Sequence, residues 1–155
     1  MQNFKDCIKG NLMMVHPDMK SSKDVKDDLN RIVNLFVKNF DKVLLCENEV
    51  KKIIIKFGEK ELEKYNASTD AAKKCPHKAA SSICIPLKKV QIITESDDIE
   101  KSVLIAGGVD YFLSELLELS GIEAINKNKK TIQKTHLEKA INDDVEVQEI
   151  IRAIS

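Results

Sequence analysis

Two long stretches of the chain carry apolar residues at helical spacing, and a short basic segment follows each of them. In residues 23–47 the apolar positions recur at intervals of three and four, which predicts a helix roughly 35–40 Å long. Residues 99–126 repeat the pattern, and Gly107 and Gly108 within them are expected to permit a close helix crossing. A helix with one apolar stripe cannot bury that stripe alone, so the two long helices are expected to pack against each other.

Shorter segments flank each long stretch in the same order. A short amphipathic helix is predicted before each, over residues 3–15, where Pro17 ends it, and from Pro86 to about residue 93. Ser21 or Ser22 is expected to cap the first long helix. The repetition of short helix and long helix indicates two copies of one folding unit.

A basic segment and a closing helix follow each long stretch. The basic segments, Lys51 to Ile55 and Lys127 to Ile132, are rich in lysine and β-branched residues, which favours short strand-like turns. The closing helices are predicted over residues 58–66, 136–141 and 145–154, with Thr135 and Glu138 as a capping box for the second of them. The sequence therefore predicts an all-α chain with units at 1–66 and 85–155, joined by a small, polar linker over 67–84.

Composition narrows the classes of function. The chain holds 25 basic and 25 acidic residues among 155, so bulk charge does not favour DNA binding, and any such binding depends on local lysine clusters. No run approaches the roughly 18 apolar residues of a membrane span, so no contact with a membrane is expected. The first ten residues lack the apolar core of a secretory signal, so a reducing compartment and free thiols are expected for the four cysteines.

Several short motifs are similar to those of core histones. The first half resembles the 2B type in Val15, His16, Pro17, Asp18, then Ser21, Ser22, Lys23, then Ile32, Val33, Asn34. The second half resembles the 2A type in Ile85, Pro86, Leu87, Lys89, then Asp110, Tyr111, then Glu115, Leu116, Leu117, Glu118, Leu119, Ser120, Gly121, then Lys129, Lys130, Thr131, then His136, Leu137, Ala140, Ile141. The order of the halves resembles the fused 2B-2A histone doublets of giant viruses of the Marseillevirus type, in a shortened form without a basic N-terminal tail or a long C-terminal helix in the first half.

This resemblance implies a fold and a function. The two units would form two histone folds clasped in an intramolecular handshake, with the strand-like turn of each unit beside the first loop of the other. The fused pair would package double-stranded DNA through phosphate contacts, together with a pair or doublet of the histone 4 and 3 types. It would act in chromatin-like particles, in a virion or viral factory if the chain is viral and in the nucleus otherwise.

The resemblance also implies particular site residues. The DNA-binding set would be Lys20, Ser21, Ser22, Lys23, Lys51, Lys52, Lys88, Lys89, Lys101, Lys127, Lys129, Lys130 and Thr131. Within it, Lys51 and Lys52 would lie beside the turn from Ser96 to Lys101, and Lys127 to Thr131 beside Lys20 to Lys23, with Lys88 and Lys89 as a middle contact. An acidic patch for arginine-bearing chromatin factors would comprise Asp110, Glu115, Glu118, Asp144 and Glu146. Asp97 and Asp98 lie where phosphate would approach, so binding weaker than that of a basic histone pair is expected.

Other interpretations remain open. The chain is alternatively a histone-fold subunit of a transcription or chromatin complex that acts through protein contacts. His16, Pro17 and Asp18 also resemble the loop of J-domain cochaperones, although only 15 residues precede them. Cys75, His77 and Cys84 are too irregularly spaced to predict a zinc site. The sequence shows neither a nucleophile with its base nor a glycine-rich phosphate loop, so neither catalysis nor a cofactor is expected.

Overall fold

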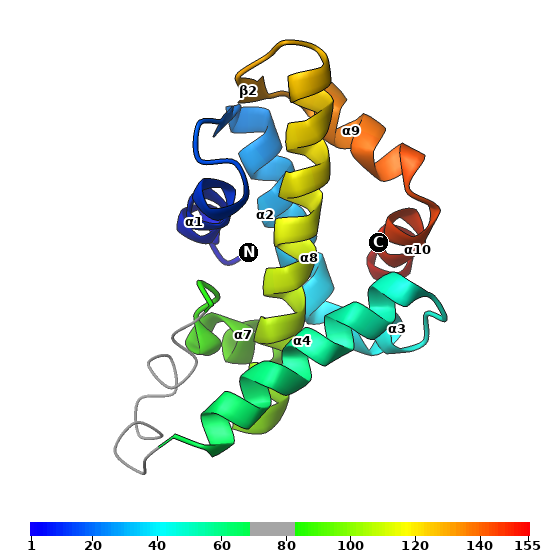
Figure 1. Cartoon of the computed structure of the whole chain (residues 1–155). Coiled ribbons are helices and arrows are strands. Elements are labelled where there is room, and N and C mark those ends of the chain that lie inside the picture. Colours follow the sequence, from blue (N-terminus) through cyan, green and yellow to red (C-terminus); the bar gives the residue numbers. More distant parts are fainter. Residues whose placement is uncertain (69–82) are drawn as a thin grey trace.

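The computed structural model describes residues 1–68 and 83–155, and these residues are mostly helical (Figure 1). The elements in chain order are α1 (Lys5–Val15), β1 (Lys20–Ser21), α2 (Lys23–Lys38), α3 (Phe40–Leu44), α4 (Glu49–Asn66), α7 (Leu87–Thr94), α8 (Ile99–Asn126), β2 (Thr131–Ile132), α9 (Lys134–Asp143) and α10 (Val145–Ile154). The all-α prediction is confirmed.

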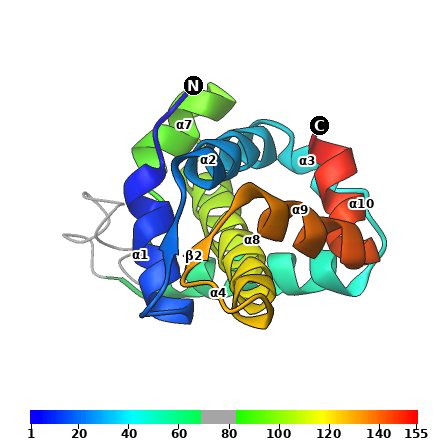
Figure 2. The same cartoon turned by 90° about the horizontal axis from the view of Figure 1, so that it is seen from above.

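The helix α8 runs through the centre of the molecule, and the other helices surround it (Figures 1 and 2). It spans the predicted 28 residues, and its buried side chains face several directions instead of forming one stripe. A helix that is apolar on most sides belongs in the interior. Phe112 of α8 stacks on Phe36 of α2 with ring centroids 5.5 Å apart, so residues of both halves build one core.

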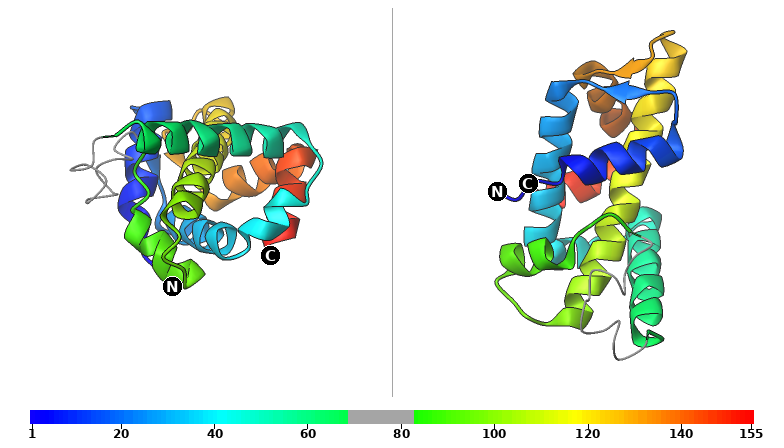
Figure 3. Two further views of the ribbon diagram at one scale, coloured as in Figure 1. Left: turned by 90° about the horizontal axis from the view of Figure 1, so that it is seen from below. Right: turned by 90° about the vertical axis from the view of Figure 1, so that its left-hand side faces the viewer.

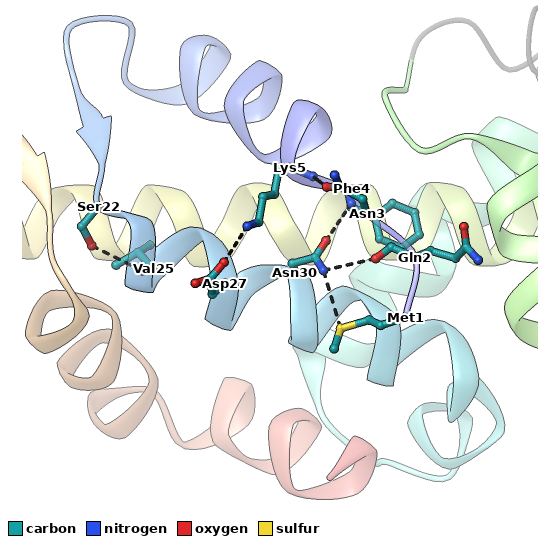
Figure 4. Close-up of polar contacts among 9 residues, drawn as sticks. All are labelled: Met1, Gln2, Asn3, Phe4, Lys5, Ser22, Val25, Asp27 and Asn30. Carbon is teal, nitrogen blue, oxygen red and sulfur yellow. Dashed lines mark hydrogen bonds and ion pairs between the residues drawn. The ribbon is translucent and has the colours of Figure 1, made fainter.

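The N-terminal segment is fastened to α2. Asn30 accepts a hydrogen bond from the backbone of Phe4 at 2.6 Å and donates one to the carbonyl of Gln2 at 3.1 Å (Figure 4). Lys5 pairs with Asp27 at 2.6 Å on the next turn of the same helix. These contacts set the position of α1 between α2 and α8.

The first long helix is shorter than predicted. Instead of continuing to residue 47, α2 ends at Lys38, and Asn39 separates it from the short helix α3. The Asn39 side chain donates a hydrogen bond to the carbonyl of Ile154 at 2.9 Å, and Phe40 is buried beside it. The apolar periodicity continues through the break, because α3 turns its buried residues toward α10 and the core.

The predicted strand-like turn from Lys51 to Ile55 is wrong, because these residues lie within α4. Asn48 caps this helix by accepting a hydrogen bond from the backbone of Lys51 at 2.8 Å. This cap and the packing of α4 on α8 outweigh the β-propensity of the isoleucines. The first half therefore ends in an 18-residue helix, not in the one or two turns expected from residue 58.

Three glycines allow α4 and α8 to approach closely. A Cβ on Gly58 would lie 2.5 Å from the carbonyl oxygen of Leu104, and one on Gly107 would lie 2.9 Å from the Phe57 carbonyl oxygen. A Cβ on Gly108 would lie 3.0 Å from the Cγ2 of Ile54. The predicted close crossing at Gly107 and Gly108 is confirmed, and Gly58 provides its counterpart on α4.

The second half agrees with prediction apart from one cap. The bounds of α8 and α10 are as expected, and α7 begins directly after Pro86. The predicted capping box of Thr135 and Glu138 is wrong, because α9 starts earlier, with Gln133 and His136 forming the reciprocal cap.

Most of the predicted linker, including Cys75 and His77, lies outside the described residues. Within residues 1–68 and 83–155, no helix has both the length and the hydropathy for spanning a membrane.

Candidate nucleic-acid interface

Two segments more than 100 residues apart meet at one end of α8. Strand β1 pairs in parallel with β2, with Lys20 opposite Thr131 and Ser21 opposite Ile132 (Figure 3). The backbone of Lys20 donates to the carbonyl of Lys130 at 3.0 Å, and that of Ser22 donates to Ile132 at 2.9 Å. The pairing of Lys20 to Lys23 with Lys127 to Thr131 is therefore as predicted.

This pairing gathers a cluster of lysines, which we call the basic end: Lys20, Lys23, Lys127, Lys129 and Lys130. All five are exposed. Within the part of the chain that the structure describes, no ion pair joins any of them to a carboxylate. Their charges are thus available to an anion.

Backbone hydrogen bonds and a left-handed residue fix the turn that follows α8. Asn128 has φ 56°, a left-handed conformation that asparagine adopts more readily than most residues. The backbones of Lys127 and Lys129 both donate to the carbonyl of Ala124, at 3.1 and 2.9 Å. The lysines at 127, 129 and 130 therefore project from an ordered turn.

Two helices begin at the basic end. β1 leads directly into α2, and β2 leads directly into α9, so the N-termini of both helices lie beside the paired strands (Figure 3). Their caps are the neutral residues Ser22 and Gln133. A helix N-terminus carries partial positive charge and free N–H groups, which attract phosphate. The terminus of α9 has no acidic residue in its first turn, whereas Asp24 offsets part of the charge at α2.

The three hydroxyl residues of the predicted DNA-binding set, Ser21, Ser22 and Thr131, are not free at the surface as the lysines are. Ser21 Oγ is buried without a hydrogen-bond partner among the described residues, so the prediction that Ser21 offers its side chain to phosphate is wrong. Ser22 Oγ accepts from the backbone of Val25 at 3.3 Å, as a cap (Figure 4). Thr131 is half-buried in β2.

Of the two lysines predicted as a middle contact with DNA, Lys89 already has partners within the chain. Lys88 is exposed on the first turn of α7. The Lys89 ammonium donates to the backbone carbonyl of Asn3 and lies 5.6 Å from the centroid of the Phe4 ring. Lys89 therefore joins the start of α1 to α7, and Lys88 projects into solvent.

The second predicted pairing is absent, which corrects the placement of Lys51, Lys52 and Lys101. Lys51 and Lys52 lie in the first turn of α4, where Lys52 pairs with Glu49 at 3.0 Å. Lys101 instead pairs with Asp41 of α3 at 3.5 Å. The turn before α8 thus meets α3, and the start of α4 meets α10.

Three of the five predicted acidic residues come together. The Tyr111 hydroxyl group bonds to Glu115, and the charges of Glu118 and Asp144 lie near enough to act on both groups. Burial raises the pKa of Tyr111 to about 12, with the neighbouring carboxylates adding to the shift. Burial and the charges of Glu118 and Asp144 raise the pKa of Glu115.

The other two acidic residues of the predicted patch hold contacts between helices. Asp110 accepts a hydrogen bond from Asn11 of α1 at 3.0 Å, and burial raises its pKa. Glu146 accepts from the backbone of Glu49 at 3.2 Å, at the start of α4. Both carboxylates join helices and are only partly open to a partner.

His16 has a packing role. Its Nε2 lies 3.0 Å from the carbonyl oxygen of Glu118, and the ring covers Gly121, where a Cβ would lie 2.2 Å from the imidazole. The ring holds the loop before β1 against α8. Within residues 1–68 and 83–155, no group of three histidine, cysteine or acidic side chains is arranged to hold a metal ion.

No protein-family model matches this sequence, and a search of curated proteins found no match to it.

Sequence reasoning missed three features of these sites. Phe57 stacks on Tyr111 with centroids 4.7 Å apart, which brings α4 to the acidic cluster. Gln133 caps α9, and Lys134 begins that helix beside the lysines predicted to bind DNA, but the sequence pattern predicted neither role. A polar residue directly after the strand-like Thr131 and Ile132 was the available signal for the cap.

Proposed function

We propose that this chain is a fused pair of histone-like units that packages double-stranded DNA. In this proposal α2 and α8 are the long helices of an intramolecular handshake, and the contacts with DNA are made to phosphate and do not depend on base sequence. The chain acts in a nucleosome-like particle together with a pair or doublet of the histone 4 and 3 types.

One observation carries the proposal. The parallel pairing of β1 with β2 places lysines from both halves, which form no ion pair with any described residue, beside two helix N-termini. Lysines and backbone N–H groups bind phosphate without reading bases. A parallel pair between the first loop of one unit and the last loop of the other is the arrangement expected for a handshake.

Reconstitution tests the packaging function. The purified chain is mixed with a histone 4-3 pair and DNA, and the product is digested with micrococcal nuclease. A protected DNA length greater than that given by the 4-3 pair alone supports the proposal. If adding the chain leaves the protected length unchanged, at a salt concentration where the 4-3 pair binds DNA, the result would contradict the packaging proposal.

A second candidate is a histone-fold subunit that acts through protein contacts in a transcription or chromatin complex. The cluster of Glu115, Glu118 and Asp144 favours it, because adjacent carboxylates suit a guanidinium group. Binding of an arginine-rich peptide, lost on Glu115→Ala with Glu118→Ala, would support this candidate. The same peptide should bind normally to a Glu59→Ala variant, since Glu59 is an exposed residue of α4.

A further inference from the structure

We infer that the chain holds DNA at the basic end alone, and that the opposite end of α8 does not bind DNA. This inference rests on the proposed function, and it specifies which part of the molecule contacts the DNA. The β1–β2 pair and the turn before α8 lie at opposite ends of this 28-residue helix (Figure 1). At 1.5 Å per residue the two ends are about 42 Å apart, more than one DNA turn of about 34–36 Å.

The described residues form one strand pair, at the basic end. Across residues 1–68 and 83–155, the only sheet is the pair of β1 with β2. The segment that would have paired with the turn before α8 is helical and starts beside α10, where Asn48 donates to Glu149 at 2.8 Å. Lys51 and Lys52 therefore do not join that turn.

The two ends of α8 also differ in charge. The turn before α8 carries Glu95, Asp97 and Asp98, all exposed. The nearest predicted lysine, Lys101, already pairs with Asp41 at 3.5 Å. Phosphate would meet repulsion here. At the basic end, the five lysines form no ion pair within residues 1–68 and 83–155, and they outnumber the neighbouring carboxylates of Asp18 and Asp24.

The helix caps also differ between the two ends. At the basic end, α2 and α9 are capped by neutral Ser22 and Gln133, and α9 has no acidic residue in its first turn, whereas α2 has Asp24 there. At the other end, the carboxylate of Asp98 accepts from the backbone of Lys101 at 3.1 Å and caps α8. At the start of α4, the carboxylate of Glu146 accepts from the backbone of Glu49 at 3.2 Å. The chain's own carboxylates thus already neutralise these two helix N-termini.

Two double variants with the same change in net charge separate the ends. The first is Lys129→Glu with Lys130→Glu, at the basic end, and the second is Lys88→Glu with Lys101→Glu, on the first turns of α7 and α8. Each is titrated against a fluorescent duplex of about three helical turns, and anisotropy is read at several salt concentrations. Far-ultraviolet circular dichroism and thermal unfolding show whether both variants stay folded, which is expected because all four side chains extend from the surface of ordered segments.

The basic-end variant should bind about tenfold more weakly and should lower the slope of log K against log salt by about 2, since each lost phosphate contact removes about 0.9. The variant with both changes on α7 and α8 should change affinity by less than about threefold and should leave the slope unchanged. Equal losses in both variants would overturn binding at one end and leave the DNA-binding proposal standing. Failure of the parent chain to bind at low salt would overturn both.

Discussion

The crossing of α4 and α8 at Gly58 gives a test in which two physical effects have opposite signs. Gly58→Ala improves the helix propensity of α4 by about 1 kcal/mol. However, the new Cβ would lie 2.5 Å from the Leu104 carbonyl oxygen, far inside the usual separation of about 3.5–4.0 Å. Overpacking a core costs about 1–3 kcal/mol, and a backbone atom cannot rotate away as a side chain can.

We expect Gly58→Ala to lower the free energy of unfolding by about 1–2 kcal/mol, because the steric cost exceeds the gain in propensity. At about 2–4 °C per kcal/mol for a chain of this size, the Tm should fall by about 2–8 °C. Urea unfolding followed by circular dichroism measures the change in free energy, and differential scanning calorimetry measures the Tm.

Gly108→Ala is the matched control, because its Cβ would lie 3.0 Å from the Cγ2 of Ile54, a side-chain methyl that can shift. Its loss of stability should be smaller than that of Gly58→Ala. A Gly58→Ala variant as stable as the parent, or more stable, would refute the conclusion that the helix backbones are in contact at this crossing.

Three further predictions concern the cap of α4, the acidic cluster and the thiols. Asn48→Ala should cost about 0.5–2 kcal/mol of stability through loss of the cap, whereas Asn48→Ser should cost less; equal Tm values for the two variants would argue against a capping role. The raised pKa of Glu115 means that the folded chain binds more protons than the unfolded chain between the two pKa values, so stability falls as pH rises through that window. Glu115→Gln should therefore stabilise the chain at neutral pH, and the gain should shrink under acidic conditions; a gain that does not change with pH would count against this cause. Burial raises the pKa of Cys7 to about 11, so in the folded chain iodoacetamide should modify Cys7 more slowly than the exposed Cys84, as mass spectrometry can resolve; equal native rates would contradict its burial.

The sequence predicted those elements whose signals are local. The bounds of α8 follow from Asp98 as a cap, a long apolar pattern and the Lys127–Asn128 turn, all of which lie within or beside the helix. The same holds for the Ser22 cap of α2. The lysine segments of the basic end were also identifiable, because their charge and β-branched residues are continuous in the chain.

The end of α2 depended on a distant contact, and the start of α4 on a local cap together with distant packing. Asn39 interrupts the helix where its side chain meets the carbonyl of Ile154, a contact between residues 115 positions apart. Residues 51–55 have strand propensity, but Asn48 and the glycine crossing with α8 hold them as a helix. Local propensity amounts to tenths of a kcal/mol per residue, which packing against a buried helix easily exceeds.

The sequence by itself determined which segments carry positive charge and where α8 begins and ends. Only the tertiary structure decided that α8 is the central helix, and that Lys51 and Lys52 lie apart from the turn before it. Electrostatic attraction for DNA depends on how closely charges are gathered, and the distance between residues far apart in the chain is set by packing.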